Sequence, residues 1–293
     1  MTTIQRSHAG VASQVTIASA ARPGKRHNED LVGVLGPHVW LLDGTSPRGR
    51  SCCDRDGAWY VQRLGSALAA TLGADSDDLQ DALEAALAAV AQEHAAQCDD
   101  PGQVAGPSAT VLIVRHQGSQ LDFLILGDSA LLLETHDGVS HHSDKRLAGV
   151  APEVRRQIKQ QLGAGHGYDS DAHRELVEDL VAAEQAVRNT DDGYWIASFD
   201  PQAAHHSLTG SRSIGDKPGQ VRRAALVSDG LERAVTLLGL CASWDELLQA
   251  LITNGPNACI EQVREAEAAD PTGQQHPRTA ASDDASAVLL EFV

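Results

Sequence analysis

Acidic residues follow the ends of apolar, strand-like segments at several places in this 293-residue chain. Asp43 follows Val-Trp-Leu-Leu, Asp128 follows Leu-Ile-Leu-Gly, and Asp229 follows Ala-Leu-Val-Ser. Glu29-Asp30 and Asp283-Asp284 stand directly before apolar runs. One Asp-Gly after a strand is ordinarily only a turn. Five acidic sites at the same end of strands instead predict carboxylates that converge wherever those strands lie side by side.

Converging carboxylates repel one another and cannot all stay ionised without a counter-charge. Basic residues near these motifs are few: Lys25 and Arg26 beside the first acidic pair, and Arg233 near Asp229. Divalent cations are the better counter-charge, and all-oxygen ligands select Mg²⁺ or Mn²⁺ over zinc or copper. Glycine at position 44 would also let a backbone carbonyl approach a ligand. Two such ions can orient a hydroxide and stabilise phosphoryl oxygens, which predicts hydrolysis of a phosphate ester.

Other chemistries have weaker support in the sequence. No Gly-rich phosphate loop of the G-x-x-x-x-G-K-[ST] type is present, which argues against a P-loop nucleotidase. Ser129 and Ser228 adjoin the acidic sites but have no recognisable base to make them nucleophiles. The five cysteines, an odd number without a C-x-x-C pair, favour reduced thiols over a disulfide framework or a zinc site. The pairs His141-His142 and His205-His206 are interpreted as exposed loop histidines.

The overall charge excludes two classes of partner. The chain carries 40 acidic and 23 basic residues, for a formal net charge of -17. Nucleic acids and anionic membranes both select basic surfaces, so neither is expected as a partner. No apolar run approaches the roughly 20 residues that span a bilayer, and the first residues lack a secretory signal, so a cytoplasmic location is expected.

Apolar patterning predicts an α+β fold. Strands are predicted at 14–19, 38–42, 108–116, 121–126, 130–135, 194–199, 223–227 and 285–292, and helices at 57–73, 76–97, 152–162, 171–188, 243–253 and 257–268. Ser76 is expected to cap the second helix, and Ser243 with Glu246 forms a capping box for the fifth. The last strand is strongly apolar and therefore predicted to be central, which would join both ends of the chain in one domain spanning 1–293.

The order of the motifs resembles the metal-dependent protein phosphatase family of type 2C (the PPM family) in its bacterial form. The resemblance rests on Lys25 to Asp30, Leu42-Asp43-Gly44, Gly106 to Thr110, Gly127-Asp128-Ser129, Ser228-Asp229-Gly230 and Asp283 to Ser286, in this succession. It implies a four-layer α-β-β-α sandwich of two packed antiparallel sheets flanked by helices. It also implies a variable, flap-like region at about 145–219.

The same resemblance implies roles for individual residues. Asp43 would bridge two Mg²⁺ or Mn²⁺ ions, with Gly44 offering its carbonyl and Asp229 and Asp283 completing the catalytic set. Asp128 would belong to a more weakly held third ion. Glu29 and Asp30 would hold metal-bound waters, Asp284 would support the ligands from behind, and Lys25 or Arg26 would bind the substrate phosphate.

Three positions depart from the family pattern. Lys25 replaces an arginine that binds phosphate in many members, and lysine lacks the bidentate fork of that side chain. Thr45 follows Asp-Gly where a histidine is common. Arg233 replaces a frequent aspartate, so we expect a weaker third metal site unless Glu232 compensates.

Three hypotheses follow. The first is a Mg²⁺/Mn²⁺-dependent phosphoric monoester hydrolase acting on phosphoserine and phosphothreonine in proteins. The second is the same hydrolysis on a small phosphorylated metabolite. The third is a catalytically weakened regulatory binding module of the same fold. The retained Asp43, Asp229 and Asp283 favour the first, because clustered carboxylates are costly in a purely structural domain.

Overall fold

The computed structural model describes residues 2–8, 11–47, 55–74, 78–98 and 106–292, and within them the strands form two antiparallel sheets. The six-stranded sheet has the order β1 (Thr2–His8), β2 (Val11–Ala20), β11 (Ala285–Phe292), β10 (Arg223–Val227), β7 (Ala130–Thr135) and β8 (Gly138–His142). The five-stranded sheet has the order β3 (Asp30–Leu35), β4 (His38–Thr45), β5 (Ser108–Gln117), β6 (Gln120–Leu126) and β9 (Leu208–Ser213). The predicted α+β class is confirmed, and the C-terminal strand is central as expected.

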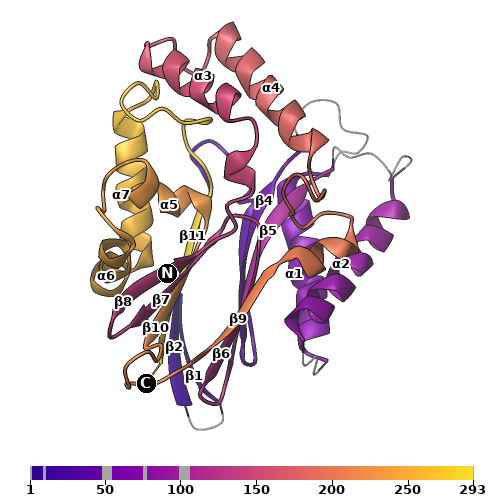
Figure 1. Cartoon of the computed structure of the whole chain (residues 1–293), viewed down its shortest axis with the longest axis vertical. Helices are drawn as coiled ribbons and strands as arrows, with labels where there is room; N and C mark the ends of the chain where they lie inside the picture. Colours follow the sequence, from indigo (N-terminus) through magenta and orange to yellow (C-terminus); the bar gives the residue numbers. More distant parts are fainter. Residues whose placement is uncertain (1, 9–10, 48–54, 75–77, 99–105, 293) are drawn as a thin grey trace.

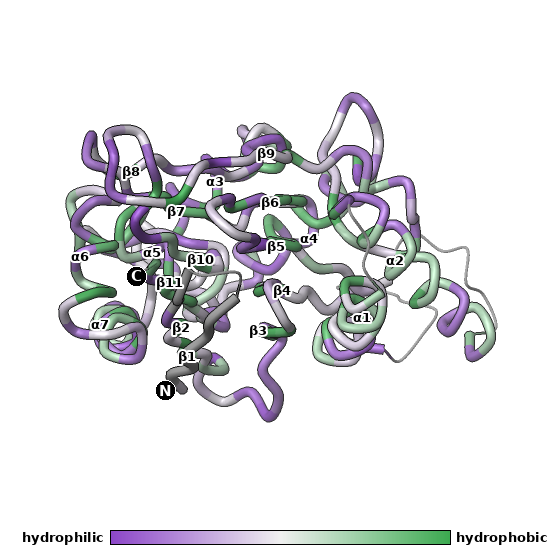
Figure 2. Tube along the Cα trace, turned by 90° about the horizontal axis from the view of Figure 1, so that it is seen from below, coloured by the Kyte–Doolittle hydropathy of each residue, from purple (hydrophilic) through white to green (hydrophobic). Residues whose placement is uncertain are grey.

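Helices cover the outer face of each sheet, so the body has four layers (Figure 1). The five-stranded sheet packs against α1 (Gly57–Leu72) and α2 (Leu79–Ala95). The six-stranded sheet packs against α5 (Asp229–Thr236), α6 (Trp244–Asn254) and α7 (Pro256–Ala269). Figure 2 shows the sheets lying between the two helical layers. This arrangement is the predicted α-β-β-α sandwich.

Strand β4 shows why the strands are so uniformly apolar. Val39 and Leu41 are fully buried between the two sheets. Trp40 and Leu42 belong to the cluster that the first two helices complete. Because both faces of the strand are covered, its sequence is a continuous apolar run rather than an alternating one. The burial of each such side chain contributes about 1.5–3 kcal/mol to the stability of the fold. The strand is therefore firmly packed, and it holds Asp43, near its end, in a fixed position.

Two further helices, α3 (Pro152–Gly163) and α4 (Asp171–Ala186), lie outside the sandwich at its upper end in Figure 1. They have a small core of their own, made of Ile158, Leu162 and Leu180. His173 Nε2 lies 3.2 Å from the carbonyl oxygen of Thr279, which ties α4 to the segment before β11. These helices fall within the region 145–219 that was predicted to be variable and flap-like.

Several predicted elements differ in detail. Residues 194–199 form isolated bridges, Ala109 with Ala197 and Arg188 with Tyr194, rather than the predicted sheet strand. Strands β1, β3, β8 and β9 were not predicted. His141 and His142 belong to β8 and not to a loop, and His141 stacks on Trp244.

Helix starts follow local chemistry. Ser76 lies outside the described residues, and Asp78 caps α2 by accepting hydrogen bonds from the backbone N–H groups of Gln80 and Asp81. Half of the predicted capping box of α6 is present, since Ser243 Oγ accepts from Glu246 N–H at 3.2 Å. The Glu246 carboxylate accepts from Ala242 N–H at 2.7 Å rather than from Ser243 N–H. In the described part of the chain, no helix is long and apolar enough to cross a membrane.

Candidate active site

The acidic residues singled out by the sequence lie at one end of the two sheets. Asp30 and Asp43 are directly paired residues of β3 and β4. Asp229 begins α5 just beyond β10, and Asp283 and Asp284 precede β11, the neighbour of β10. The pairing of strands that are distant in sequence therefore brings these acids to a common edge.

Packing explains the glycines beside two of these acids. A Cβ atom at Gly44 would lie 2.5 Å from the carbonyl oxygen of Glu29, the same oxygen that accepts a hydrogen bond from Gly44 N–H at 2.9 Å. A Cβ atom at Gly230 would lie 1.9 Å from the carbonyl oxygen of Asp284. Neither position can take a side chain without moving backbone, so the Asp-Gly pairs let the acidic segments touch one another.

A cavity of about 420 Å³ opens at this edge. Its lining includes Gly44 and five of the acids that were predicted from the sequence, namely Glu29, Asp43, Asp128, Asp229 and Asp283. Helices α3 and α4 and the segment after them also line the cavity, through residues such as Arg155, Glu184, Arg188 and Tyr194. Asp30 and Asp284, which were also predicted, do not line the cavity and lie buried behind it.

Hydrogen bonds fix the two buried acids. Asp30 Oδ2 accepts from Ser228 Oγ at 2.8 Å, and the same hydroxyl oxygen accepts from Ser286 N–H at 2.9 Å. The other oxygen of Asp30 has no hydrogen-bond partner among the described residues. Asp284 accepts from the backbone N–H groups of Arg22 and Glu29, each at 2.7 Å, and so holds both ends of the loop between β2 and β3.

The protein raises the pKa values of five aspartates at this edge, namely Asp30, Asp43, Asp128, Asp229 and Asp283. Burial is the first cause at Asp43, followed by the negative charges of Asp229, Asp30, Asp283 and Asp128, and together they hold its pKa well above 3.8. Burial raises the pKa of Asp30 to about 8. Burial, and then the charge of Asp229, raise the pKa of Asp283 to about 6. Such shifts are expected where like charges gather, and a bound cation would reverse them.

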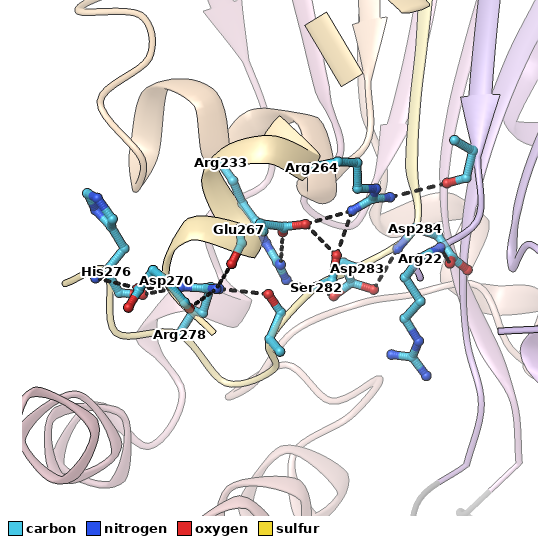
Figure 3. A network of polar contacts seen from close by, with 12 residues as sticks. Arg22, Arg233, Arg264, Glu267, Asp270, His276, Arg278, Ser282, Asp283 and Asp284 are labelled. Atoms are coloured by element: carbon cyan, nitrogen blue, oxygen red, sulfur yellow. Dashed lines mark hydrogen bonds and ion pairs between the residues drawn. The ribbon is translucent and has the colours of Figure 1, made fainter. Parts of the chain in front are cut away.

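The basic residues near the cavity differ from those expected. Lys25 Nζ lies 2.6 Å from Glu29 Oε1, and Arg26 is exposed. Neither side chain lines the cavity, whereas Arg22 does. The backbone N–H of Arg22 donates a hydrogen bond to Asp284, and Figure 3 shows that the Arg22 guanidinium points away from this acid. Ser46 Oγ donates a hydrogen bond to the Glu29 carboxylate, which fixes that side chain from the other side.

Arg233 bonds to two acids that are distant from it in the sequence. Its Nη2 donates to Asp283 Oδ2 at 2.9 Å, and its Nη1 donates to Glu267 Oε1 at 2.6 Å (Figure 3). Glu232, the adjacent residue, has a buried Oε1 without a hydrogen-bond partner in the described part of the chain. Burial, and then the charges of Asp128 and Asp229, hold the Glu232 pKa well above 4.5. The cation at position 233 therefore acts on Asp283 and on the nearby charge of Asp229, and a weaker third metal site stays a prediction.

Some contributors to the site have no clear signal in the sequence. Ser228 is adjacent to Asp229, but its hydrogen bond to Asp30 joins segments of two different sheets. Arg22 lies in a loop whose course depends on Asp284, 262 residues away.

As the side chains are placed, no three His, Cys, Asp or Glu residues of the described segments form a group that could hold one metal ion.

Comparison with known proteins agrees with this geometry. A model of the protein phosphatase 2C family matches residues 27–265, so the chain belongs to that family. It is accordingly a phosphoric monoester hydrolase of a metal-dependent family. No curated protein matches the chain.

Three solved structures with the same fold are distant from this chain in sequence. The serine/threonine phosphatase PstP/Ppp of Mycobacterium tuberculosis is 17% identical with a TM-score of 0.56, over 96% of this chain and 98% of that one. The catalytic domain of PstP in complex with two manganese ions is 16% identical with a TM-score of 0.55, over 97% and 99%. Stp1 from Staphylococcus aureus is 13% identical with a TM-score of 0.55, over 94% of each chain. At these identities the likeness establishes the fold.

Proposed function

We propose that the chain is a Mg²⁺- or Mn²⁺-dependent phosphatase that hydrolyses phosphoserine and phosphothreonine in proteins. The observation that carries the proposal is the cavity, whose lining gathers Glu29, Asp43, Asp128, Asp229 and Asp283 from separate strand ends. Membership in the phosphatase 2C family supplies the reaction class. The manganese ions of the PstP complex support the choice of metal.

The residues present fit hard divalent cations. The acidic side chains that line the cavity end in carboxylate oxygens, which are ligands that Mg²⁺ and Mn²⁺ prefer. The unpartnered, buried Oδ1 of Asp30 and the raised pKa of Asp43 are both signs of missing positive charge. When bound there, divalent cations supply Lewis acidity that polarises a phosphoryl oxygen and makes water a better nucleophile.

Individual roles follow from position. We assign Asp43, the Gly44 carbonyl, Asp229 and Asp283 to the two principal ions, and Asp128 to a weaker third. Glu29, which lines the cavity, would hold metal-bound water by accepting its hydrogen bonds, and Asp30 would support Ser228, beside Asp229, from behind the cavity. Asp284 would act indirectly, since it holds the backbone of the loop that carries Glu29.

Arg22 is the best candidate for binding the substrate phosphate. It lines the cavity, and its planar guanidinium can form two parallel hydrogen bonds with phosphate oxygens. The predicted candidates are less suited, because Lys25 is paired with Glu29 and Arg26 points to solvent. Replacing Arg22 with glutamine should raise KM for a phosphopeptide about tenfold, whereas the same change at Arg26 should leave KM within about twofold. Equal effects at the two positions would contradict this assignment.

Hydrolysis measured with millimolar Mn²⁺ tests the function as a whole. Purified protein should release phosphate from phosphoserine and phosphothreonine peptides faster than from a panel of small phosphorylated metabolites. Asp229→Asn should lower kcat/KM by about 10²–10³-fold, as expected when a group stabilising the transition state is removed. Asp137→Asn is the matched control, because Asp137 is exposed in the β7–β8 turn and should have no effect. Faster turnover of a metabolite would favour a small-molecule substrate, and wild-type activity in Asp229→Asn would contradict the site.

A further inference from the structure

Arg233 connects the cavity to a buried polar cluster behind it. The guanidinium bridges Asp283 of the cavity and Glu267 of α7, at 2.9 and 2.6 Å. The Arg233 side chain is only 10% exposed and that of Glu267 only 3%, whereas Asp283 is 33% exposed. An arginine keeps its charge in any protein environment, so this buried cation is permanent.

Glu267 holds Arg233 firmly in place. Its carboxylate also accepts a hydrogen bond from Arg264 Nη1 at 2.9 Å and one from Ser282 Oγ. Arg264 in turn donates to Ser282 Oγ at 2.9 Å and to the carbonyl oxygen of Ala20 in β2 at 3.3 Å. These hydrogen bonds join α5, α7, the end of β2 and the segment before β11, and Figure 3 shows the cluster from close by. Because Glu267 is itself held by Arg264 and Ser282, Arg233 is not free to swing away from Asp283.

Both oxygens of Asp283 are engaged by protein groups. Oδ2 accepts from Arg233, and Oδ1 accepts from Asp284 N–H at 3.1 Å. A divalent ion that bound Asp283 Oδ2 would have to displace Arg233 Nη2 and would lie beside its permanent positive charge. Two cations at such close range repel each other, so that exchange is opposed.

We propose that Arg233, anchored by Glu267, is a built-in competitor for Asp283 that lowers the affinity of the centre for its second divalent ion. The inference rests on the proposed function, because it takes Asp283 as a metal ligand. Arg233 is here a positioning residue that touches neither substrate nor reacting atoms. A purely structural role would instead tie the fold together without lowering metal affinity.

Calorimetric titration with Mn²⁺ alone tests the inference without measuring catalysis. Arg233→Gln should tighten the weaker Mn²⁺ binding step about tenfold, since close charge pairs couple at least this strongly. Arg233→Lys keeps the charge and should stay within about threefold of the wild type. Arg222→Gln is the control for net charge: Arg222 pairs with Glu134, and it stands just before β10, at the opposite end of that strand from Asp229.

Folding should survive the substitution, because Glu267 keeps Arg264 and Ser282 as partners in Arg233→Gln. If that variant does not fold, the double variant Arg233→Gln/Glu267→Gln removes both members of the buried pair and should show the same gain. Unchanged or weaker Mn²⁺ binding in the folded variant overturns the inference, as does an equal gain in Arg222→Gln. A wild-type protein that binds Mn²⁺ but hydrolyses no phosphate ester would contradict the proposed function and leave the comparison of affinities intact.

Discussion

Two arginine–aspartate pairs lie in the same polar region and differ in what surrounds them (Figure 3). Arg278 with Asp270 and Arg233 with Asp283 have the same nitrogen–oxygen distance, 2.9 Å. Both side chains of the first pair are 4% exposed. In the second pair Asp283 is 33% exposed and lines the cavity. Identical residue types at an identical distance thus sit in a closed and in an open environment.

The carboxyl groups of these pairs have opposite pKa shifts. Burial alone would raise the pKa of Asp270, but hydrogen bonds from His276 N–H and Gln275 N–H, together with Arg278, hold it below 3.8. Asp283 accepts one backbone N–H, and burial, followed by the charge of Asp229, raises its pKa to about 6 despite Arg233. An arginine partner alone therefore does not show that a carboxylate has only a structural role. The remaining hydrogen bonds and the neighbouring charges decide whether the group is satisfied or available.

The largest expected effect is on the closed pair. Asp270→Asn should lower the free energy of unfolding by about 3–5 kcal/mol, because the buried Arg278 charge loses its counter-ion. The turnover number of the folded protein should stay within about twofold of the wild type. Urea unfolding and initial phosphatase rates on the same sample measure the two quantities. A large loss of turnover in fully folded Asp270→Asn would erase the distinction between the pairs.

The open pair should respond in the reverse sense. Asp283→Asn should lower kcat/KM by about 10²–10³-fold, corresponding to about 3–4 kcal/mol of lost transition-state stabilisation. The unfolding free energy without metal should change by less than about 1 kcal/mol, since Arg233 keeps Glu267 as a partner. The same rate and unfolding assays apply. An Asp283→Asn protein that is fully active, or one that fails to fold, would show that Asp283 is structural after all.

Much of this architecture is readable from sequence, and the reason is local. Strands such as β4 and β11 are apolar on both faces, which makes them visible as short runs, and the acids that end them mark the site. Strand β9 was missed because most of its side chains are exposed and polar. Residues 194–199 resemble a strand in composition, yet they pair only through isolated bridges at Ala109 and Arg188.

The partners of the acids were beyond reach of the sequence. The bond of Ser228 to Asp30 joins residues 198 positions apart on different sheets. Arg233 lies four residues from Asp229 in the chain, but its guanidinium reaches Asp283 because α5 directs it toward the start of β11. Motif spacing identifies which residues are present at a site. The packing of helices on the sheets determines which of them touch, and this depends on the whole fold.

Acid titration should separate the two pairs by sign. A depressed native pKa makes Asp270 stabilising above pH 3.8, and that contribution is lost as the pH falls through the depressed value. The raised pKa of Asp283 has the opposite sign: its stabilising contribution is full below pH 3.8 and is lost as the pH rises to about 6. Because Asp283 is one-third exposed, screening should reduce this second effect to about 1 kcal/mol.

Unfolding of metal-free protein between pH 3 and 7 measures both contributions. The stability gap between wild type and Asp270→Asn should shrink below pH 4. Relative to Asp283→Asn, the wild type should lose stability between pH 4 and 6. The same sign of change for both variants would contradict the opposite environments inferred for the two carboxyls.

The smallest effect on stability is expected for an ion pair that is exposed to solvent. Arg63 Nε lies 3.2 Å from Glu93 Oε1 between α1 and α2, with side chains 50% and 33% exposed. Water competes for both groups and salt screens them, so Arg63→Gln should change the unfolding free energy by less than about 0.5 kcal/mol and leave Mn²⁺ affinity unchanged. Urea unfolding at low and high salt is the measurement. A loss near that of Asp270→Asn would mean that burial does not decide how much an arginine–carboxylate pair contributes to stability in this protein.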